Sequence, residues 1–484
     1  MDSVRAAIFG VALSCLLYLW NLNRVLKKTP PEILALSPHR WTDEEIEETY
    51  NKVKKNPISW SEHLPPKLNR RYIVTGGSGG VGGQVILQLL ERGQPPESIR
   101  NVDFRAPERK DLLTGPAASV EFVHADISSA SSTEAAFSKP WPASVAKLPL
   151  TVFHVAALIV PHERSVATYH RVERVNVDGT RNVLGSAKAA GADVFIATSS
   201  ASIGLVPTRF WGPPWRPWPK NWVQVLAESD FHKPVKPHSD FFANYAHSKA
   251  VAERLVCGAN SPTFRTGTIR PGNGIYGSSH ADQFVGMVLR AGTSPTWTPN
   301  VLQNCVHVGH VSLAHLLFEA ALLGSEEMPG CAGRPFNITD PGPAALFQDY
   351  YKLMQKLAVT PTKVIPVPPV PLLLFAYVVE ALDSLSRAPG FKWVKPSGDL
   401  AMLQPSIFSA TTHVPIIDTA AKKSVAEGGL GFKGVCTTIE GMCQQVLDWN
   451  VDHGFQVEQA DDTVLTSISK GARNIATTPA SVKA

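Results

Sequence analysis

Apolar positions follow two different spacings along the middle of the chain. Short apolar runs of strand type alternate with stretches that have helical spacing, and this alternation predicts a parallel sheet covered by helices. The strand-type runs are residues 71–75, 99–104, 120–124, 151–156 and 194–199, and the helical patterns include residues 85–90, 171–190 and 246–256. We therefore predict a Rossmann-like, doubly wound α/β fold with its ligands at the carboxyl edge of the sheet.

The N-terminal segment has a different pattern. Ala6–Trp20 is an uninterrupted apolar run between Arg5 and a basic cluster at residues 24–28. Its length approaches the ~20 residues that a membrane-spanning helix needs. We predict a membrane anchor at residues 1–28, with a buried core helix as the alternative. Because the basic residues lie mostly on its C-terminal side, the positive-inside tendency places the rest of the chain in the cytosol.

The remaining segments differ in composition. Residues 29–69 are polar and contain six prolines, which is typical of a semi-rigid linker, and Thr42 is a candidate N-cap for one short helix there. Residues 456–484 lack apolar periodicity and are predicted to be a disordered tail. The catalytic domain is then residues 70–455. Within it we expect a nucleotide-binding core at about 70–280 and substrate elements at about 205–245 and 280–455, the latter forming a smaller C-terminal substrate-binding subdomain.

Composition excludes several classes of protein. The 484 residues are 44% hydrophobic and 18% charged, which excludes a disordered chain, and the mean hydropathy of -0.03 excludes a multi-span membrane protein. A net charge of +5 is too small and too dispersed to indicate nucleic-acid binding. The six cysteines form no CxxC pair and no Cys/His zinc spacing, so we expect a reducing compartment and no metal site.

A glycine-rich segment stands between the first strand-type run and the first helical pattern. The spacing TGxxGxxG is typical of a dinucleotide-binding turn, because glycine permits positive φ and lets the pyrophosphate approach the main chain. The start of the following helix then offers N–H groups to the phosphates. The predicted cofactor contacts in this segment are Gly76, Gly79, Gly80, Val81 and Gly82.

An acidic residue ends the second strand-type run. Asp103 lies 21 positions after Gly82, close to the ~20 expected for the carboxylate that binds the adenosine ribose. A carboxylate there accepts hydrogen bonds from the ribose hydroxyls and repels a 2′-phosphate, which favours NAD. Arg105 and Arg109 lie close by and leave NADP open.

A tyrosine and a lysine stand at the start of a later helical pattern. Tyr245 and Lys249 are spaced i to i+4, which puts the phenol and the ammonium group on one helix face. A neighbouring ammonium group lowers the pKa of a phenol and suits it for general acid–base work. A preceding strand ends in Thr198-Ser199-Ser200, and a serine there can donate a hydrogen bond to a substrate oxygen.

These motifs resemble those of the extended short-chain dehydrogenase/reductases, in particular the 3β-hydroxysteroid dehydrogenase family. Within it, the chain is most similar to the sterol-4α-carboxylate 3-dehydrogenases (decarboxylating). The resemblance covers roughly residues 70–455. Segments that carry it include TGGSGGVG (75–82), VHADIS (123–128), RVNVDGTRNVL (174–184), ATSSAS (197–202), YAHSK (245–249), IRPGNGIYG (269–277) and AAKKSVAEGGLGF (420–432).

The resemblance implies roles for individual residues. It assigns the catalytic serine, tyrosine and lysine to Ser200, Tyr245 and Lys249, and it implies that Asn176 supports the active site. Tyr245 and Lys249 would also contact the cofactor. On the cofactor side, Asp126 and Ile127 would meet the adenine, and the backbone at Pro271–Ile275 would border the nicotinamide.

We therefore expect an NAD(P)-dependent oxidoreductase that acts on the CH–OH group of a sterol- or steroid-like substrate. It would be held by a single-pass anchor in a membrane such as the endoplasmic reticulum, and relatives of this kind often form homodimers. A dehydrogenase or ketoreductase of a specialised terpenoid or polyketide pathway is one alternative. A non-catalytic nucleotide-binding scaffold is another.

Two apolar segments bear on the substrate. Phe210–Trp222 carries four tryptophans and several prolines, so it is either a lid over a bulky substrate or a self-packed loop. Pro366–Leu385 is apolar but too short to span a bilayer with certainty. It is either an interfacial helix or a helix of the substrate domain.

Overall fold

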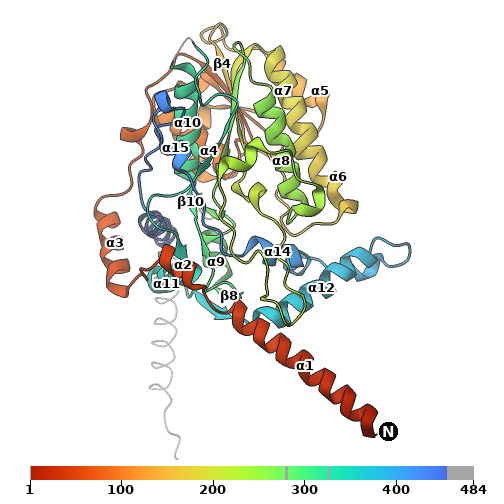
Figure 1. The fold of residues 1–484 in the computed structure, drawn as a ribbon. Coiled ribbons are helices and arrows are strands. Elements are labelled where there is room, and N and C mark those ends of the chain that lie inside the picture. Colours follow the sequence, from red (N-terminus) through yellow and green to blue (C-terminus); the bar gives the residue numbers. More distant parts are fainter. Residues whose placement is uncertain (1, 278–281, 325–326, 455–484) are drawn as a thin grey trace, which may run out of the picture.

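A seven-stranded parallel sheet forms the centre of the computed structural model, which describes residues 2–277, 282–324 and 327–454 (Figure 1). The strand order is β11-β6-β5-β4-β1-β2-β3. Strands are added in one direction from β1 to β3 and in the opposite direction from β4 onward. This change of strand order lies between β1 and β4, which is where a doubly wound sheet opens a crevice for ligands. The strands are β1 Arg71–Thr75, β2 Ile99–Asp103, β3 Glu121–His124, β4 Leu150–His154, β5 Ala192–Thr198, β6 Arg265–Pro271 and β11 Pro335–Ile338.

Helices cover both faces of this sheet. Successive strand residues point to opposite faces, and the apolar residues on each face pack against helices. Tyr72 and Val74 pack with α4 (Gly80–Glu91) and α10 (Val308–Leu323) on one face. Ile73 packs on the other face. The helices there are α5 Ala130–Ser138, α7 Gly179–Ala189 and α8 Asn244–Gly258. The predicted Rossmann-like fold is confirmed.

The predicted helix at residues 171–190 is interrupted. The chain forms α6 (Tyr169–Val172), then a π-helical turn at Glu173–Asp178, and then α7. The side chain of Asn176, inside this turn, bonds to the backbone of Leu158. A wider turn of this kind is frequent at functional sites.

The C-terminal part of the chain builds a second group of elements below the sheet. It contains three short pairs of strands: β7 (Ile275–Tyr276) with β10 (Val306–His307), β9 (Leu302–Gln303) with β12 (Ala345–Leu346), and β8 (Thr293–Thr296) with β13 (Lys363–Pro366). Its helices are α9 Val285–Ala291, α11 Phe347–Leu357, α12 Pro369–Leu385, α13 Asp399–Met402, α14 Pro405–Ala410 and α15 Thr419–Lys422, and residues 438–454 are also helical.

Residues 29–69, the predicted linker, pack against this C-terminal part. They form α2 (Pro31–Leu36) and α3 (Asp43–Lys55), and the predicted cap is present, because Glu45 N donates to Thr42 Oγ1 at 3.1 Å. Ile46 and Val53 of α3 are buried in a cluster with Tyr350 and Met442. This segment therefore packs as part of the C-terminal group of elements, in addition to connecting residues 1–28 to the sheet.

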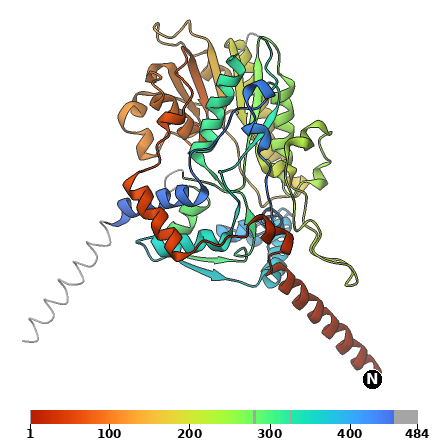
Figure 2. The ribbon, with the colours of Figure 1, turned by 60° about the vertical axis from the view of Figure 1, so that its left-hand side comes forward.

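The predicted anchor is a helix that projects from the body. This helix, α1 (Asp2–Leu26), is apolar and long enough to cross a membrane. Its C-terminal end contacts α12, while its N-terminal end points away from the rest of the molecule (Figure 2). The predicted disordered tail at 456–484 lies outside the described residues.

Candidate active site

The glycine turn between β1 and α4 is too tightly folded for side chains at two positions. Gly76 has a φ of +73°, and a Cβ on it would lie 2.6 Å from the backbone nitrogen of Ala156. A Cβ on Gly82 would lie 2.2 Å from the carbonyl oxygen of Gly76. Both contacts are with backbone, which cannot move aside, so the turn needs glycine as the dinucleotide motif predicts.

The acidic residue at the end of β2 is bound to this turn. Asp103 Oδ2 accepts a hydrogen bond from Ser78 N at 3.0 Å, so its carboxylate lies beside the glycines. Arg109 reaches the same turn from the other direction and donates to the carbonyl oxygens of Gly79 (3.1 Å) and Gly80 (2.9 Å). The structure thus brings the predicted ribose ligand and the turn together.

The other predicted cofactor residues lie at the same edge of the sheet. Asp126 and Ile127 follow β3, and Pro271 is the last residue of β6. Asp126 Oδ1 accepts from Ser128 N at 2.9 Å, and Ile127 O accepts from Asn182 at 2.9 Å. The fold therefore places every predicted cofactor contact along one carboxyl edge.

The predicted catalytic residues meet between β5 and α8. Tyr245, at the start of α8, lies beside Ser200, which follows β5. Ser200 Oγ lies 2.7 Å from Ser202 Oγ, a neighbour that sequence reasoning missed. One turn further along α8, Lys249 Nζ donates to the carbonyl oxygen of Thr198 at 2.6 Å.

The ionisation of this pair differs from the sequence-based prediction. Burial raises the pKa of Tyr245 to about 12, and the hydrogen bond from Ser200 only partly offsets it. Burial also lowers the pKa of Lys249 to about 8. The predicted lowering of the phenol pKa is therefore wrong for this arrangement, because the Lys249 ammonium group bonds to Thr198 and desolvation dominates.

Asn176 connects the loop after β4 to α8. Its side-chain oxygen accepts from Leu158 N at 2.7 Å, and its side-chain nitrogen donates to Leu158 O and to Ser248 Oγ, each at 3.0 Å. Ser248 lies between Tyr245 and Lys249 in α8. Asn176 therefore holds α8 against the loop after β4.

A buried histidine beneath the site was missed by sequence reasoning. Thr180 Oγ1 donates to Asn176 O at 2.6 Å, so it accepts from His154 Nε2 at 3.0 Å. His154 Nδ1 then accepts from Thr75 Oγ1 at 2.7 Å. Burial and the nearby Lys249 lower the pKa of His154 to about 3, so the ring is neutral. The sequence feature that could have indicated this histidine is its position as the last residue of a buried strand.

Comparison with known proteins agrees with this geometry. A model of the 3-beta hydroxysteroid dehydrogenase/isomerase family matches residues 73–369. The chain belongs to this family. It is therefore an NAD(P)-dependent short-chain dehydrogenase/reductase, as the motifs predict.

Relatives of this dehydrogenase include enzymes that act on sterols. It is 25% identical to a short-chain dehydrogenase/reductase family 42E member 1 of Xenopus laevis, over 79% of this chain and 88% of the relative. It is 27% identical to a decarboxylating sterol-4-alpha-carboxylate 3-dehydrogenase of Schizosaccharomyces pombe, over 65% and 83% of the two chains. It is 29% identical to human 3 beta-hydroxysteroid dehydrogenase type 7, over 58% and 70%.

Solved structures share the fold of this dehydrogenase. The UDP-glucose 4-epimerase of Thermotoga maritima has a TM-score of 0.52 at 17% identity and covers 79% of this chain and 99% of its own. The terminal R domain from the myxalamid PKS-NRPS biosynthetic pathway has a TM-score of 0.52 at 20% identity and covers 85% and 98%. At these identities the likeness establishes the Rossmann-like fold alone.

The pKa of Lys249 leads to a prediction about stability. In the unfolded chain a lysine ammonium group is solvated and has a pKa near 10.5, whereas burial lowers the pKa of Lys249 to about 8. The charged form therefore destabilises the folded dehydrogenase below pH 8, and this penalty disappears as the pH rises from 8 to above 10.5. At pH 7, Lys249→Met should have a free energy of unfolding higher than that of the wild type by up to about 3 kcal/mol, and it should therefore unfold at a higher temperature. The gain should shrink at pH 10.

Thermal unfolding of the two proteins at both pH values measures this effect. Lys147→Met, at an exposed lysine, is the control and should leave the unfolding temperature unchanged at both. A gain for Lys249→Met that is the same at pH 7 and pH 10 would contradict the ionisation argument.

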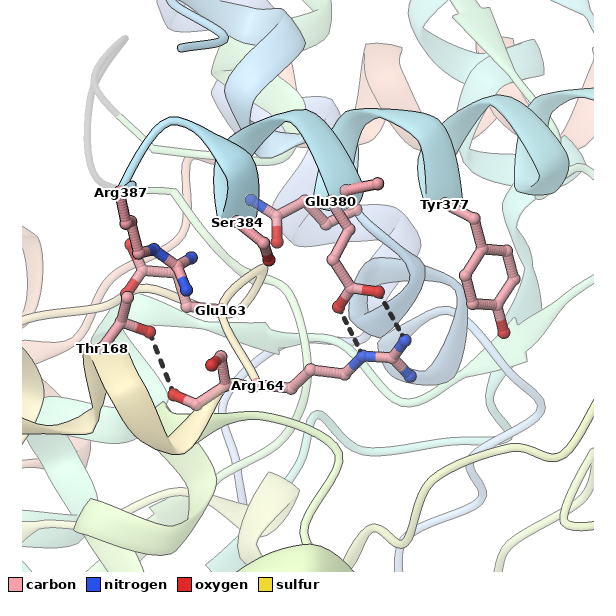
Figure 3. A pocket seen from close by; sticks show the side chains of 10 residues that line it. Glu163, Arg164, Thr168, Tyr377, Glu380, Ser384 and Arg387 are labelled. Carbon is pink, nitrogen blue, oxygen red and sulfur yellow. Dashed lines mark hydrogen bonds and ion pairs between the residues drawn. The ribbon is translucent and has the colours of Figure 1, made fainter. Parts of the chain in front are cut away.

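A cavity of about 590 Å³ lies between α12 and the loop at residues 163–168 (Figure 3). Arg164 crosses it and binds Glu380 of α12 with two hydrogen bonds of 2.6 and 2.7 Å. The loop is tied to α8, because Asn244, the residue before Tyr245, donates from its backbone nitrogen to Glu163 O and from its side chain to Ser165 O, each at 2.8 Å. The cavity thus borders the loop that binds the start of α8, although Ser200, Tyr245 and Lys249 do not line the cavity.

The tryptophan-rich segment 210–222 packs against both itself and other elements. Trp218 Nε1 donates to Pro213 O at 2.8 Å within the segment, and Trp211 Nε1 donates to the hydroxyl of Tyr377 in α12 at 3.2 Å. Trp222 is buried in a cluster with α12. Leu226, a little further on, packs in one cluster with Ala201, the residue after Ser200. The segment therefore packs against α12, and the residues that follow it pack beside Ser200.

Proposed function

We propose that this dehydrogenase uses NAD to oxidise the 3β-hydroxyl of a sterol- or steroid-like substrate, with a 4-carboxysterol as the favoured substrate. The observation that carries the proposal is the meeting of Ser200, Tyr245 and Lys249 at the sheet edge that holds the glycine turn. The sterol-4-alpha-carboxylate 3-dehydrogenase among the relatives supports the choice of substrate.

The residues of the glycine turn fit a dinucleotide. The Cβ atoms that Gly76 and Gly82 lack would fill the turn, and Asp103 presents its carboxylate beside it. Gly76, Gly79 and Gly82 would lie under the pyrophosphate, and Asp103 would accept hydrogen bonds from the ribose hydroxyls. When bound, the nicotinamide would serve as the hydride acceptor.

The protein residues perform the proton chemistry. Ser200 holds the substrate oxygen, and Tyr245 takes the hydroxyl proton while the carbinol hydride leaves. Because burial raises the pKa of Tyr245 to about 12 and Lys249 bonds to Thr198 O, proton removal by Tyr245 requires Lys249 to turn toward the phenol when cofactor and substrate bind. If the substrate carries a carboxylate next to the new ketone, the product is a β-keto acid. It loses carbon dioxide through an enolate without a further site.

The assay that tests this function uses purified protein in membranes. We expect NADH formation from NAD with a 4-carboxysterol, accompanied by release of carbon dioxide, and slower turnover of a 3β-hydroxysteroid without the carboxylate. Turnover only of unrelated terpenoid or polyketide alcohols would favour the specialised pathway. Absence of reduced nucleotide with every substrate, including a lipid extract, would favour the non-catalytic scaffold.

Asp103 should control the choice of cofactor. Asp103→Ala removes hydrogen bonds to the ribose and the charge that repels a 2′-phosphate, so the preference for NAD over NADP should fall by about 10-fold or more. Initial rates with both cofactors measure the ratio. Glu97→Ala, which removes an exposed carboxylate just before the start of β2, at the opposite end of the strand from Asp103, is the control. An unchanged ratio in Asp103→Ala would remove this residue from cofactor selection.

We also propose that α1 anchors the enzyme in the membrane of the endoplasmic reticulum with the catalytic domain in the cytosol. The single apolar helix and the basic residues that follow it support this orientation. Protease protection of the catalytic domain in intact microsomes tests it. Degradation of that domain from the cytosolic side is expected.

A further inference from the structure

The end of α1 that meets the body is fixed in place. Leu22 and Leu26 are buried against α12 and the tryptophan-rich segment. Tyr18 OH accepts from Gly212 N at 3.2 Å, and Asn23 Oδ1 accepts from Val370 N at 3.2 Å. The part of α1 from residue 18 onward is therefore attached to the rest of the protein.

Among the residues of α1 whose burial the structure describes, the exposed stretch clear of the body is 3–17. At about 1.5 Å per residue this free part is about 22 Å long, whereas the hydrocarbon core of a bilayer is about 30 Å thick. An α1 that spans the bilayer must therefore also place residues from Tyr18 onward in the hydrocarbon. Those residues carry α12 and the tryptophan-rich segment with them to the membrane.

One side of α12 is apolar and uncovered. The outer face of α12 is between 36% and 51% exposed and consists of Leu374, Phe375, Val378, Leu382 and Leu385. The two acidic residues of the helix are both paired, Glu380 with Arg164 and Asp383 with Arg387. The helix therefore presents no unpaired carboxylate that would oppose contact with lipid.

The segments next to this face have the composition of a membrane–water interface. Trp393 and Trp215 are 81% and 80% exposed, and Lys392 and Lys395 flank Trp393 on the surface. Exposed tryptophans typically lie at the level of the headgroups, and neighbouring lysines attract anionic lipids. Both α1 and α12 lie at the end of the molecule away from β4 (Figure 1).

We infer that the outer face of α12 lies in the membrane leaflet next to the body, beside α1, with Trp215 and Trp393 at the headgroup level. The enzyme is then held by two elements, a spanning helix and an in-plane helix. This places the cavity behind α12, and the Arg164–Glu380 pair that crosses it, directly above the lipid. The inference rests on the proposed anchor α1 and is independent of the substrate.

Depth-dependent quenching of a fluorophore tests this position in the full-length protein. Cys15→Ser removes the exposed cysteine, since the other five are buried, and an environment-sensitive label is then attached at Val378→Cys. In vesicles of phosphatidylcholine and phosphatidylserine, the label should emit at a shorter wavelength than the same label on a short peptide in water. Doxyl-labelled lipids should quench it. A label at Leu113→Cys, an exposed leucine of the nucleotide-binding core, should do neither.

Two outcomes would overturn the inference. Emission typical of water at residue 378 would mean that α1 alone contacts the membrane. A shift to shorter wavelength without quenching by doxyl lipids would mean that a second copy of the chain covers the face. A label at Leu382→Cys repeats the measurement should the first variant fail to fold, and because no activity is measured, failure of the proposed reaction does not affect the result.

Discussion

Replacing Tyr245 with phenylalanine should lower kcat by about 10²- to 10⁴-fold, the range that a positioned acid–base group supplies. The substitution removes only the phenol hydroxyl and keeps the half-buried ring at the start of α8. Binding of NAD, which depends on the glycine turn and Asp103, should change little. Steady-state NADH formation and calorimetric NAD titration measure the two effects separately.

Tyr50→Phe is the matched control for this variant. Tyr50 lies in α3 and its hydroxyl accepts a hydrogen bond from Asn450, outside the active site, so this substitution should leave kcat unchanged. If Tyr245→Phe kept more than about a hundredth of the wild-type rate, Tyr245 would not be the proton-transfer group. If both catalysis and NAD binding were lost, the variant would indicate a structural role instead.

The sequence predicted those parts of the molecule whose chemistry is local. The glycine turn and the spacing of Tyr245 and Lys249 each depend on a few consecutive residues, and the structure places them as predicted. Asp103 also needed only its distance from the turn. Their roles in binding and catalysis remain predictions for the variants described above.

Features that depend on distant partners could not be predicted. The break in the helix at Asn176 depends on hydrogen bonds to Leu158, which is 18 residues away. Ile46 and Val53 lie on one face of α3, but the sequence did not show that a surface formed 300 residues later buries them. The pKa of Tyr245 depends on how completely the fold excludes water, and spacing from Lys249 alone gave the wrong direction.

The glycine turn gives the second large effect, on cofactor binding. Gly82→Ala would place a Cβ 2.2 Å from Gly76 O and 2.9 Å from Gly77 Cα. Because both neighbours are backbone, the turn must open, and it would then no longer match the pyrophosphate. Strain of this kind costs about 1–3 kcal/mol, so the Kd for NAD should rise by about 10- to 100-fold. Calorimetric titration with NAD measures the change.

Gly185→Ala separates this local effect from the general effect of adding a methyl group. Gly185 lies in α7, is exposed, and a Cβ there would meet no atom within 4 Å. Because alanine favours a helix over glycine, this variant should be more stable by about 0.5–1 kcal/mol and bind NAD like the wild type. Equal NAD affinity in Gly82→Ala and Gly185→Ala would show that the turn does not contact the pyrophosphate. A higher Kd only in Gly82→Ala would place the dinucleotide on the turn that connects β1 to α4.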